Sequence, residues 1–320
     1  MKAVVFSDAL RFVANHPEPS VPPGWSRIRV SIAGICKTDL ELVKGYLGFQ
    51  GVLGHEFVGR VESPDGQFGR RVVGDINAAC GKCQWCASGM GRHCPNRATL
   101  GIDGLDGCMA EFCMLPSGNL YDVPDSLSDE HAVLVEPLSA ACEILEQHPL
   151  RGDERVVVLG DGKLGIFCAW VLAGCCEDVV LVGKHPEKLA IAEWRNVRTV
   201  LTTDPMDSGA DLVVEATGSE RGLARAIELC RPRGAVCLKS TVAAKHQLNL
   251  APVVIKEQTL FGSRCGQFKD GLAWLERFPD APLDRLIAAR YPIEKAEEAF
   301  RQAASSSLKI LLEVGASTDR

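Results

Sequence analysis

The stretch from residue 155 to residue 173 constrains the fold more than any other part of the chain. It opens with an unbroken apolar run typical of strands buried on both faces of a parallel sheet, Arg155-Val156-Val157-Val158-Leu159. Next come Gly160-Asp161-Gly162-Lys163-Leu164-Gly165 and an apolar helical segment over 164–173. Similar alternation continues to residue 238. We therefore predict an α/β chain with a doubly wound parallel sheet.

The glycine spacing in this turn matches the dinucleotide-binding fingerprint. The spacing alone is weak evidence, but here a strand precedes it and a second strand, 179–182, follows the helix. The glycines would let the backbone approach a pyrophosphate at the helix N-terminus. Asp161, out of place beside a phosphate, is expected to point away. The candidate coenzyme-binding residues are Gly160, Gly162, Lys163, Leu164 and Gly165 in the turn, and Gly183, Lys184 and His185 after the second strand.

The end of the second strand bears on which coenzyme binds. The fingerprint has an acid here that accepts the ribose hydroxyls of NAD, whereas this chain has Gly183 followed by Lys184. An acid would repel the 2′-phosphate of NADP by about 4 kcal/mol at ~4 Å and an effective dielectric of ~20. We therefore expect NADP(H) to be preferred and NAD(H) tolerated. Alternatively, Gly183 is only a turn glycine and Lys184 a solvated charge.

Four cysteines are clustered at metal-binding spacing. Three are separated by two residues each and the fourth comes seven residues later: Cys80, Cys83, Cys86 and Cys94. A closed set of four thiolates is typical of a structural zinc site. An iron–sulfur cluster or a nucleic-acid-binding zinc ribbon is the alternative. The net charge of −6 argues against a nucleic-acid surface.

A second set of zinc-type donors lies in apolar surroundings: Cys36, His55, Glu56 and Glu136. A buried carboxylate is costly unless it is paired or bound to a cation, which favours a metal site. Taken alone, His55 is better explained as a hydrogen-bonded core histidine, and Glu136 could instead be a paired core acid. Pro137 favours an extended backbone at Glu136, before a helix over 139–147.

Two residues near Cys36 have candidate catalytic roles. Asp39 can accept a hydrogen bond from the far ring nitrogen of His55 and so orient a metal ligand. Thr38 has a hydroxyl that can accept and pass on a proton. Both residues could instead simply cap the short helix expected over 38–43.

Gly34-Ile35-Cys36-Lys37-Thr38-Asp39, followed by Gly54-His55-Glu56, resembles the zinc-containing medium-chain dehydrogenases, which include alcohol, sorbitol, threonine and glucose dehydrogenases. The resemblance implies a β-rich GroES-like catalytic domain, 1–140 with 266–320, and a Rossmann nucleotide-binding domain, 141–265. It also implies one catalytic zinc and one structural zinc, with Thr38 relaying a proton. Glu136 stands where thiolate-rich alcohol dehydrogenases use a second cysteine. Whether Glu56 or Glu136 binds zinc directly stays open.

The expected activity is hydride transfer between an alcohol or polyol and NAD(P), with Thr38, Asp39 and Glu56 as candidate catalytic residues. The alternatives are a zinc-free quinone or enoyl reductase of the same fold and a non-catalytic cofactor-binding protein. The expected partner is a small alcohol, polyol or carbonyl compound, with no nucleic acid or membrane, and a homodimer or homotetramer is expected. The first apolar run is too short for a signal peptide and 166–176 is too short to span a bilayer, which predicts a cytoplasmic location.

Overall fold

The computed structural model describes residues 1–63, 67–241, 247–305 and 308–315. The chain divides into two compact units. Unit 1 comprises Met1–Glu136 and Ile287–Arg320, and unit 2 comprises Pro137–Leu286. Unit 1 is therefore interrupted by unit 2, and residues 137–140 and 266–286 belong to unit 2.

An aromatic cluster explains why 266–286 belongs to unit 2. Helix α9 (Phe268–Arg277) directs Trp274 inward, where its ring lies 6.5 Å from that of Trp170 on α5 (Lys163–Leu172). Phe278, directly after α9, lies 5.9 Å from Trp194. Burial of large aromatic surfaces is a strong packing contribution, and it attaches this segment to the unit that holds α5.

The main sheet of unit 1 is built around its longest strand, β3 (Trp25–Ile35), which pairs with β5, β10 and β19. The strand order is β11-β6-β5-β3-β19-β18, with β10 also paired to β3. The bounds are β5 (Glu56–Ser63), β6 (Arg71–Gly74), β10 (Phe112–Pro116), β11 (Leu120–Asp122), β18 (Ile287–Pro292) and β19 (Lys309–Glu313). Both strands that follow unit 2 in sequence thus join the unit 1 sheet: β19 lies beside β3, and β18 lies beyond β19 at the edge.

Two small sheets and short helices complete unit 1. The sheets have the orders β2-β1-β4, with β1 (Ala3–Phe6), β2 (Leu10–Val13) and β4 (Gly51–Val52), and β7-β8-β9, with β7 (Asn77–Ala78), β8 (Ala98–Leu100) and β9 (Gly104–Leu105). The helices are α1 (Lys37–Val43), α2 (Gln84–Ala87), α3 (Asp129–Ala132) and α10 (Ala296–Ser305), with 3-10 turns η1 (Tyr46–Gly48), η2 (Gly91–His93), η3 (Ser117–Asn119) and η6 (Ile293–Lys295). Helix α10 buries Ala296, Ala299, Phe300 and Ala303, a spacing that places them on one helix face.

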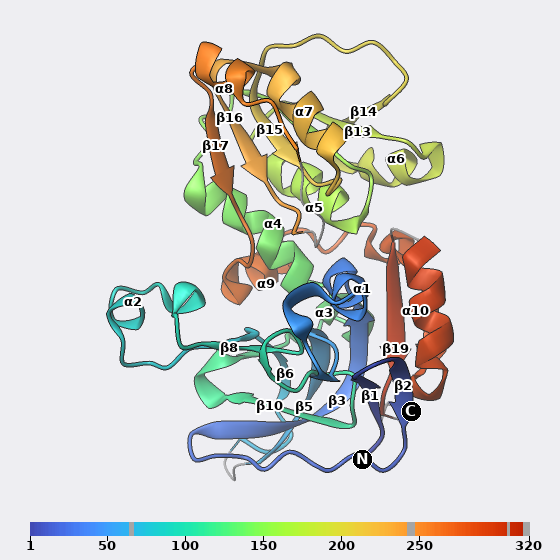
Figure 1. Cartoon of the computed structure of the whole chain (residues 1–320). Coiled ribbons are helices and arrows are strands. Elements are labelled where there is room, and N and C mark those ends of the chain that lie inside the picture. Colours follow the sequence, from blue (N-terminus) through green and yellow to red (C-terminus); the bar gives the residue numbers. More distant parts are fainter. Residues whose placement is uncertain (64–66, 242–246, 306–307, 316–320) are drawn as a thin grey trace. The chain divides into compact units, whose positions relative to one another are not determined.

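Unit 2 contains a six-stranded parallel sheet in the order β14-β13-β12-β15-β16-β17 (Figure 1). The strands are β12 (Arg155–Leu159), β13 (Asp178–Gly183), β14 (Arg198–Leu201), β15 (Ala210–Glu215), β16 (Cys230–Leu238) and β17 (Thr259–Gly262). The helices are α4 (Val135–Gln147), α5, α6 (Pro186–Ala192), α7 (Glu220–Leu229), α8 (Ala251–Ile255) and α9, with η4 (Trp194–Asn196) and η5 (Leu283–Leu286). The predicted fold class, a β-rich domain plus a doubly wound parallel sheet, is confirmed.

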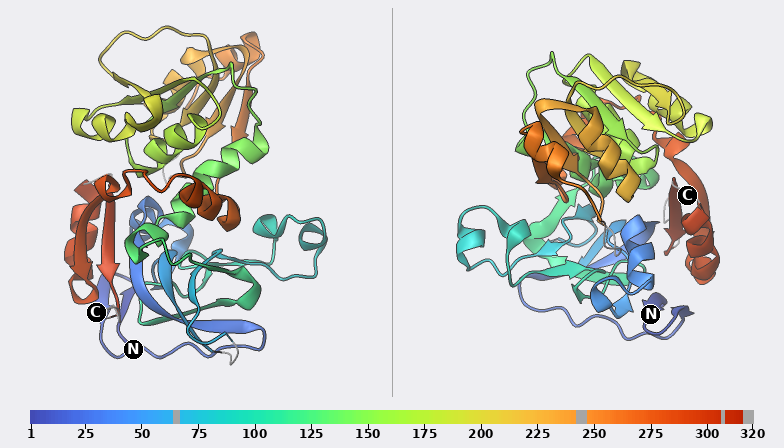
Figure 2. Two further views of the ribbon diagram at one scale, coloured as in Figure 1. Left: turned by 180° about the vertical axis from the view of Figure 1, so that it is seen from behind. Right: turned by 45° about the horizontal axis from the view of Figure 1, so that its top comes forward.

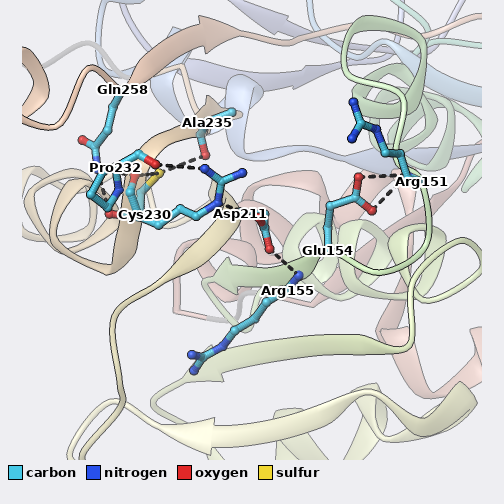
Figure 3. A network of polar contacts seen from close by, with 9 residues as sticks. Arg151, Glu154, Arg155, Asp211, Cys230, Pro232, Ala235 and Gln258 are labelled. Carbon is cyan, nitrogen blue, oxygen red and sulfur yellow. Dashed lines mark hydrogen bonds and ion pairs between the residues drawn. The ribbon is translucent and has the colours of Figure 1, made fainter.

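A polar network joins the amino ends of three strands in unit 2 (Figure 3). Asp211 on β15 accepts the backbone N–H of Arg155 on β12 at 2.8 Å and the side-chain Nε–H of Arg231 on β16 at 2.6 Å. Glu154 accepts the backbone N–H groups of Arg151 and Gly152. The carboxyl ends of these strands, where ligands bind in open parallel sheets, lie at the opposite end of the strands from this network.

The extended backbone predicted at Glu136 is wrong. Helix α4 begins at Val135, so Glu136 and Pro137 both lie in its first turn. Proline is tolerated there because the first N–H groups of a helix have no partner within the helix. In the part of the chain that the structure describes, no helix combines the length and apolar character needed to cross a membrane.

Candidate metal and coenzyme sites

Cys36 lies where β3 ends and α1 begins. It is the N-cap residue of α1, and its backbone N–H donates to Oδ2 of Asp39 at 2.7 Å. Its Sγ lies 3.8 Å from Oγ1 of Thr38. The Cys36 thiol and the Thr38 hydroxyl therefore lie together at the start of α1. Asp39 caps this helix end and also lies at the candidate site, so its two possible roles are compatible.

His55 and Glu56 come from the start of β5. The His55 side chain is 3% exposed, and its Nδ1 lies 3.2 Å from Oδ1 of the fully buried Asp39. Asp39 therefore contacts both the Cys36 backbone and the His55 ring. Burial by itself lowers the pKa of His55, but the neighbouring Asp39 and Cys36 acids raise this pKa well above its usual value.

Three of the four expected donors converge. The donor atoms of Cys36, His55 and Glu56 lie within 4.8 Å of one another. Thiolate, imidazole and carboxylate are the three ligand types that zinc accepts, and a set of three protein ligands is typical of catalytic rather than structural sites. Among the described residues, Glu136 does not join this group and lies instead in the first turn of α4.

Glu56 has a partner that the sequence analysis missed. Nζ of Lys309, on β19, forms an ion pair with Oε2 of Glu56, and both side chains are fully buried. The strand order β5-β3-β19 brings them together across β3. A Cβ atom on Gly34 of β3 would lie 2.5 Å from Oε2 of Glu56 and 3.3 Å from Cδ of Lys309. The only sequence signal was a lone lysine at the start of an apolar strand.

The four clustered cysteines form a compact group in a lobe of unit 1 that stands away from its strands (Figures 1 and 2). The sulfur–sulfur distance is 3.5 Å both for Cys80–Cys94 and for Cys83–Cys86. It is 3.6 Å for Cys83–Cys94 and 4.0 Å for Cys80–Cys86. A tetrahedral zinc ion about 2.3 Å from each sulfur requires about 3.8 Å between sulfurs. The arrangement therefore fits a closed tetrathiolate zinc site.

The backbone of this lobe also favours thiolate at one position. The N–H groups of Lys82 and Cys83, together with the neighbouring thiols, lower the pKa of Cys80 to about 6. Desolvation and the adjacent thiols raise the pKa of Cys86 to about 11. One sulfur is thus readily ionised at neutral pH, whereas the last protons leave only when a cation compensates the crowded negative charge.

The glycine turn of unit 2 has the tight geometry that the fingerprint requires. Gly160 has a φ of +117°, and Gly162 is the N-cap of α5. A Cβ atom on Gly165 would lie 1.8 Å from the carbonyl oxygen of Gly160. Only glycine at 165 lets α5 approach the end of β12 this closely, and this close approach is what the dinucleotide-binding fingerprint requires of its third glycine.

Asp161 turns away from this helix end, as the sequence analysis expected. Its Oδ2 accepts the backbone N–H groups of Lys184 and His185 at 2.7 and 2.8 Å and lies 2.8 Å from Nδ1 of His185. It also fills the space beside Gly183, where a Cβ atom would lie 2.5 Å from that of Asp161. The Asp161 carboxylate, which comes from the end of β12, therefore lies close to Gly183, the position at the end of β13 where the fingerprint has an acid.

Two family models match the chain. The first, described as the alcohol dehydrogenase GroES-like domain, matches residues 22–125. The second, described as the glucose dehydrogenase C-terminus, matches residues 129–314. Together they cover both units.

The chain is also similar to individual proteins over most of its length. It is 27% identical to the starvation-sensing protein RspB of Escherichia coli K12, over 94% of this chain and 95% of that protein. It is 30% identical to the L-threonine 3-dehydrogenase of Chelativorans sp. BNC1, over 77% and 78%. Among solved structures, the alcohol dehydrogenase TADH from Thermus sp. ATN1 matches with a TM-score of 0.84 and 28% identity, over 98% and 100%.

Proposed function

Because the chain belongs to the zinc-containing medium-chain dehydrogenase/reductase family, we propose that it transfers a hydride between an alcohol or polyol and NAD(P). The observation that carries this proposal is the convergence of Cys36, His55 and Glu56 in a chain that also has a dinucleotide-type glycine turn. The similarity to L-threonine 3-dehydrogenase supports a small secondary alcohol as the substrate class.

The metal donors fit zinc, which would be held by Cys36, His55 and a carboxylate. We favour Glu56 over Glu136 for this carboxylate, either directly or through water, because Glu56 lies with the other two donors. When bound, zinc stabilises negative charge on oxygen, and it lowers the pKa of water from about 16 to about 7. On an alcohol the same shift corresponds to about 12 kcal/mol of anion stabilisation, at about 1.36 kcal/mol per pKa unit.

The residues around the donors have complementary tasks. Asp39 holds the His55 ring through Nδ1, which leaves Nε2 as the atom that binds metal. The Thr38 hydroxyl, close to Cys36 Sγ, takes the substrate's proton and passes it towards solvent. The four cysteines of the lobe hold a second zinc that stabilises the lobe and takes no part in the chemistry.

The coenzyme is NAD(P)(H), and we propose that NADP(H) is preferred and NAD(H) tolerated. Gly183 carries no acid, and Lys184 beside it is exposed and can reach a 2′-phosphate. The Asp161 carboxylate opposes this preference, but its Oδ2 already accepts two backbone N–H groups and contacts His185. A cytoplasmic location stays a prediction from the sequence.

A homo-oligomer is proposed as the working form. Strand β17 ends the sheet of unit 2, and α8, just before it, exposes Val254 and Ile255 by 76% and 81%. An edge strand next to exposed apolar side chains is a surface that a second copy of the chain can cover.

The test is a dehydrogenase screen over polyols, sugars, threonine and simple alcohols with both coenzymes, using unmodified protein and His55→Ala. The variant should lose turnover and keep coenzyme binding, because the glycine turn lies in unit 2. His16→Ala, a unit 1 histidine outside the donor set, should keep turnover. Full turnover of the unmodified protein after metal removal would exclude zinc chemistry and favour a zinc-free reductase.

A further inference from the structure

Lys239 is a buried lysine at the carboxyl edge of the unit 2 sheet, and the proposed reaction gives it no role. It follows β16 directly and is 6% exposed. Its Nζ donates to Oγ of Ser263 at 2.9 Å and to the carbonyl of Arg264 at 2.8 Å, both just after β17. Its backbone N–H donates to the carbonyl of Glu215, the last residue of β15. Lys239 thus lies where β15, β16 and β17 all end.

The surroundings of Lys239 compensate its charge only in part. Burial lowers its pKa, while Cys168, Cys237, Cys265 and Glu143 raise it. The first two thiols are neutral at neutral pH, since burial raises the pKa of Cys168 to about 12 and that of Cys237 to about 11. Of these four groups, Glu143 on α4 is the carboxyl group, and the other three are thiols.

The topology of unit 2 relates Lys239 to one end of the coenzyme. A doubly wound sheet consists of two mononucleotide-binding halves, with the ligand at the carboxyl ends of the strands. The glycine turn and the Gly183 turn belong to the half β12–β14, which takes the adenosine end. The half β15–β17 is left for the nicotinamide end, and Lys239 ends its middle strand.

We propose that Lys239 makes the coenzyme site discriminate between the two redox forms, favouring the reduced, neutral nicotinamide over the oxidised, cationic one. The inference rests on the proposed function, because it assumes that this edge binds a nicotinamide coenzyme. A fixed ammonium repels the oxidised ring and leaves the reduced ring unaffected. If the two charges are separated by ~10 Å, such a pair at an effective dielectric of ~20 weakens binding about tenfold or more.

The test is direct binding of oxidised and reduced coenzyme, without turnover, to unmodified protein and to Lys239→Met. The readout is the ratio of the two dissociation constants, oxidised over reduced, for NADP and for NAD. In Lys239→Met this ratio should fall about tenfold, equivalent to about 1.4 kcal/mol, mainly through tighter binding of the oxidised form. Ser263→Ala, which removes one hydrogen-bond acceptor and keeps the charge, should leave the ratio unchanged.

The other outcomes are distinct. If both coenzyme forms lose affinity equally in Lys239→Met, the lysine only tethers the ends of β16 and β17 and the inference is wrong. An unchanged ratio in Lys239→Met also overturns it. If Lys239→Met does not fold, Lys239→Gln supplies a second neutral variant and must show the same fall. Failure of the unmodified protein to bind either coenzyme would instead refute the proposed function itself.

Discussion

The Glu56–Lys309 pair places a full charge of each sign in the core of unit 1. Forming such a pair is costly, but removing one partner costs more, about 3–5 kcal/mol, because the other charge stays buried. If Glu56 binds zinc as proposed, Lys309 competes with the metal ion for the same carboxylate. The pair would then link folding stability to metal binding through a residue that is not itself a donor.

Replacing Lys309 by Met should lower the stability of zinc-depleted protein by about 3–5 kcal/mol. Added zinc should restore more stability to this variant than to the unmodified protein, because the cation then compensates Glu56. Thermal unfolding with and without zinc measures both effects. Lys2→Met removes an exposed ion pair with Glu294 and should change little. An equal zinc-induced rise in Tm for Lys309→Met and unmodified protein would contradict this link.

Asp161 places a negative charge next to the Gly183 turn, where we propose that the adenosine ribose binds. The Asp161→Asn variant keeps the shape and removes the charge, so the kcat/KM ratio of NADP over NAD should rise about tenfold, as expected for one screened charge pair. Steady-state kinetics with both coenzymes measure this. Asp8→Asn, an exposed acid of unit 1, serves as the control and should leave the ratio unchanged. A ratio that falls in Asp161→Asn would show that the carboxylate helps to bind NADP rather than opposing it.

At the scale of elements, the cysteine lobe is held by short helices that cannot be stable alone. Helix α2 spans Gln84–Ala87 and η2 spans Gly91–His93, far below the length at which isolated helices persist. The zinc ion that we propose for the four sulfurs would provide the cross-link that a hydrophobic core would otherwise supply.

Cys83→Ser should therefore remove about one zinc per chain and lower Tm, while a second zinc remains at Cys36 and His55. Metal analysis of the purified variant and thermal unfolding check this. Cys175→Ser changes an exposed thiol outside the group and should retain both the metal and Tm. Full zinc content in Cys83→Ser would be incompatible with a tetrathiolate site.

The elements that were predictable are those with a strong local pattern. The strands β12, β13 and β15 and the helix α5 each show a contiguous apolar run bounded by glycines. The local sequence pattern therefore predicts which of these elements are strands and which is a helix, and their order along the chain. The start of α4 is mispredicted because a proline favours an extended backbone at the residue before it, whereas α4 already includes Val135 and Glu136. The partners of Glu56 and Asp161 could not be predicted, since each depends on strand order: Lys309 is 253 residues from Glu56 in sequence.

At the scale of the whole molecule, the proposed oligomer depends on an exposed apolar surface of unit 2 and not on the candidate metal or coenzyme sites. The α8 side chains Val254 and Ile255 are the most exposed large apolar residues of the described chain, next to the sheet edge β17. The double variant Val254→Glu, Ile255→Glu should dissociate an oligomer into monomers, measured by light scattering after size exclusion. Phe68→Glu, an exposed apolar residue of unit 1, is the matched control and should keep the assembly. A monomeric unmodified protein would refute the proposed oligomer.

The interruption of unit 1 by unit 2 also sets the order of events during synthesis. About 150 residues, Pro137–Leu286, must be translated between the first part of unit 1 and its closing strands. At ~5–20 residues per second this takes roughly 8–30 s. Throughout that interval the β3 edge that later pairs with β19 has no neighbour, and the lysine that pairs with Glu56 has not been made. The four cysteines of the lobe all lie within 80–94, so the zinc ion proposed for them could bind on the ribosome, whereas the proposed Cys36 site would be completed last.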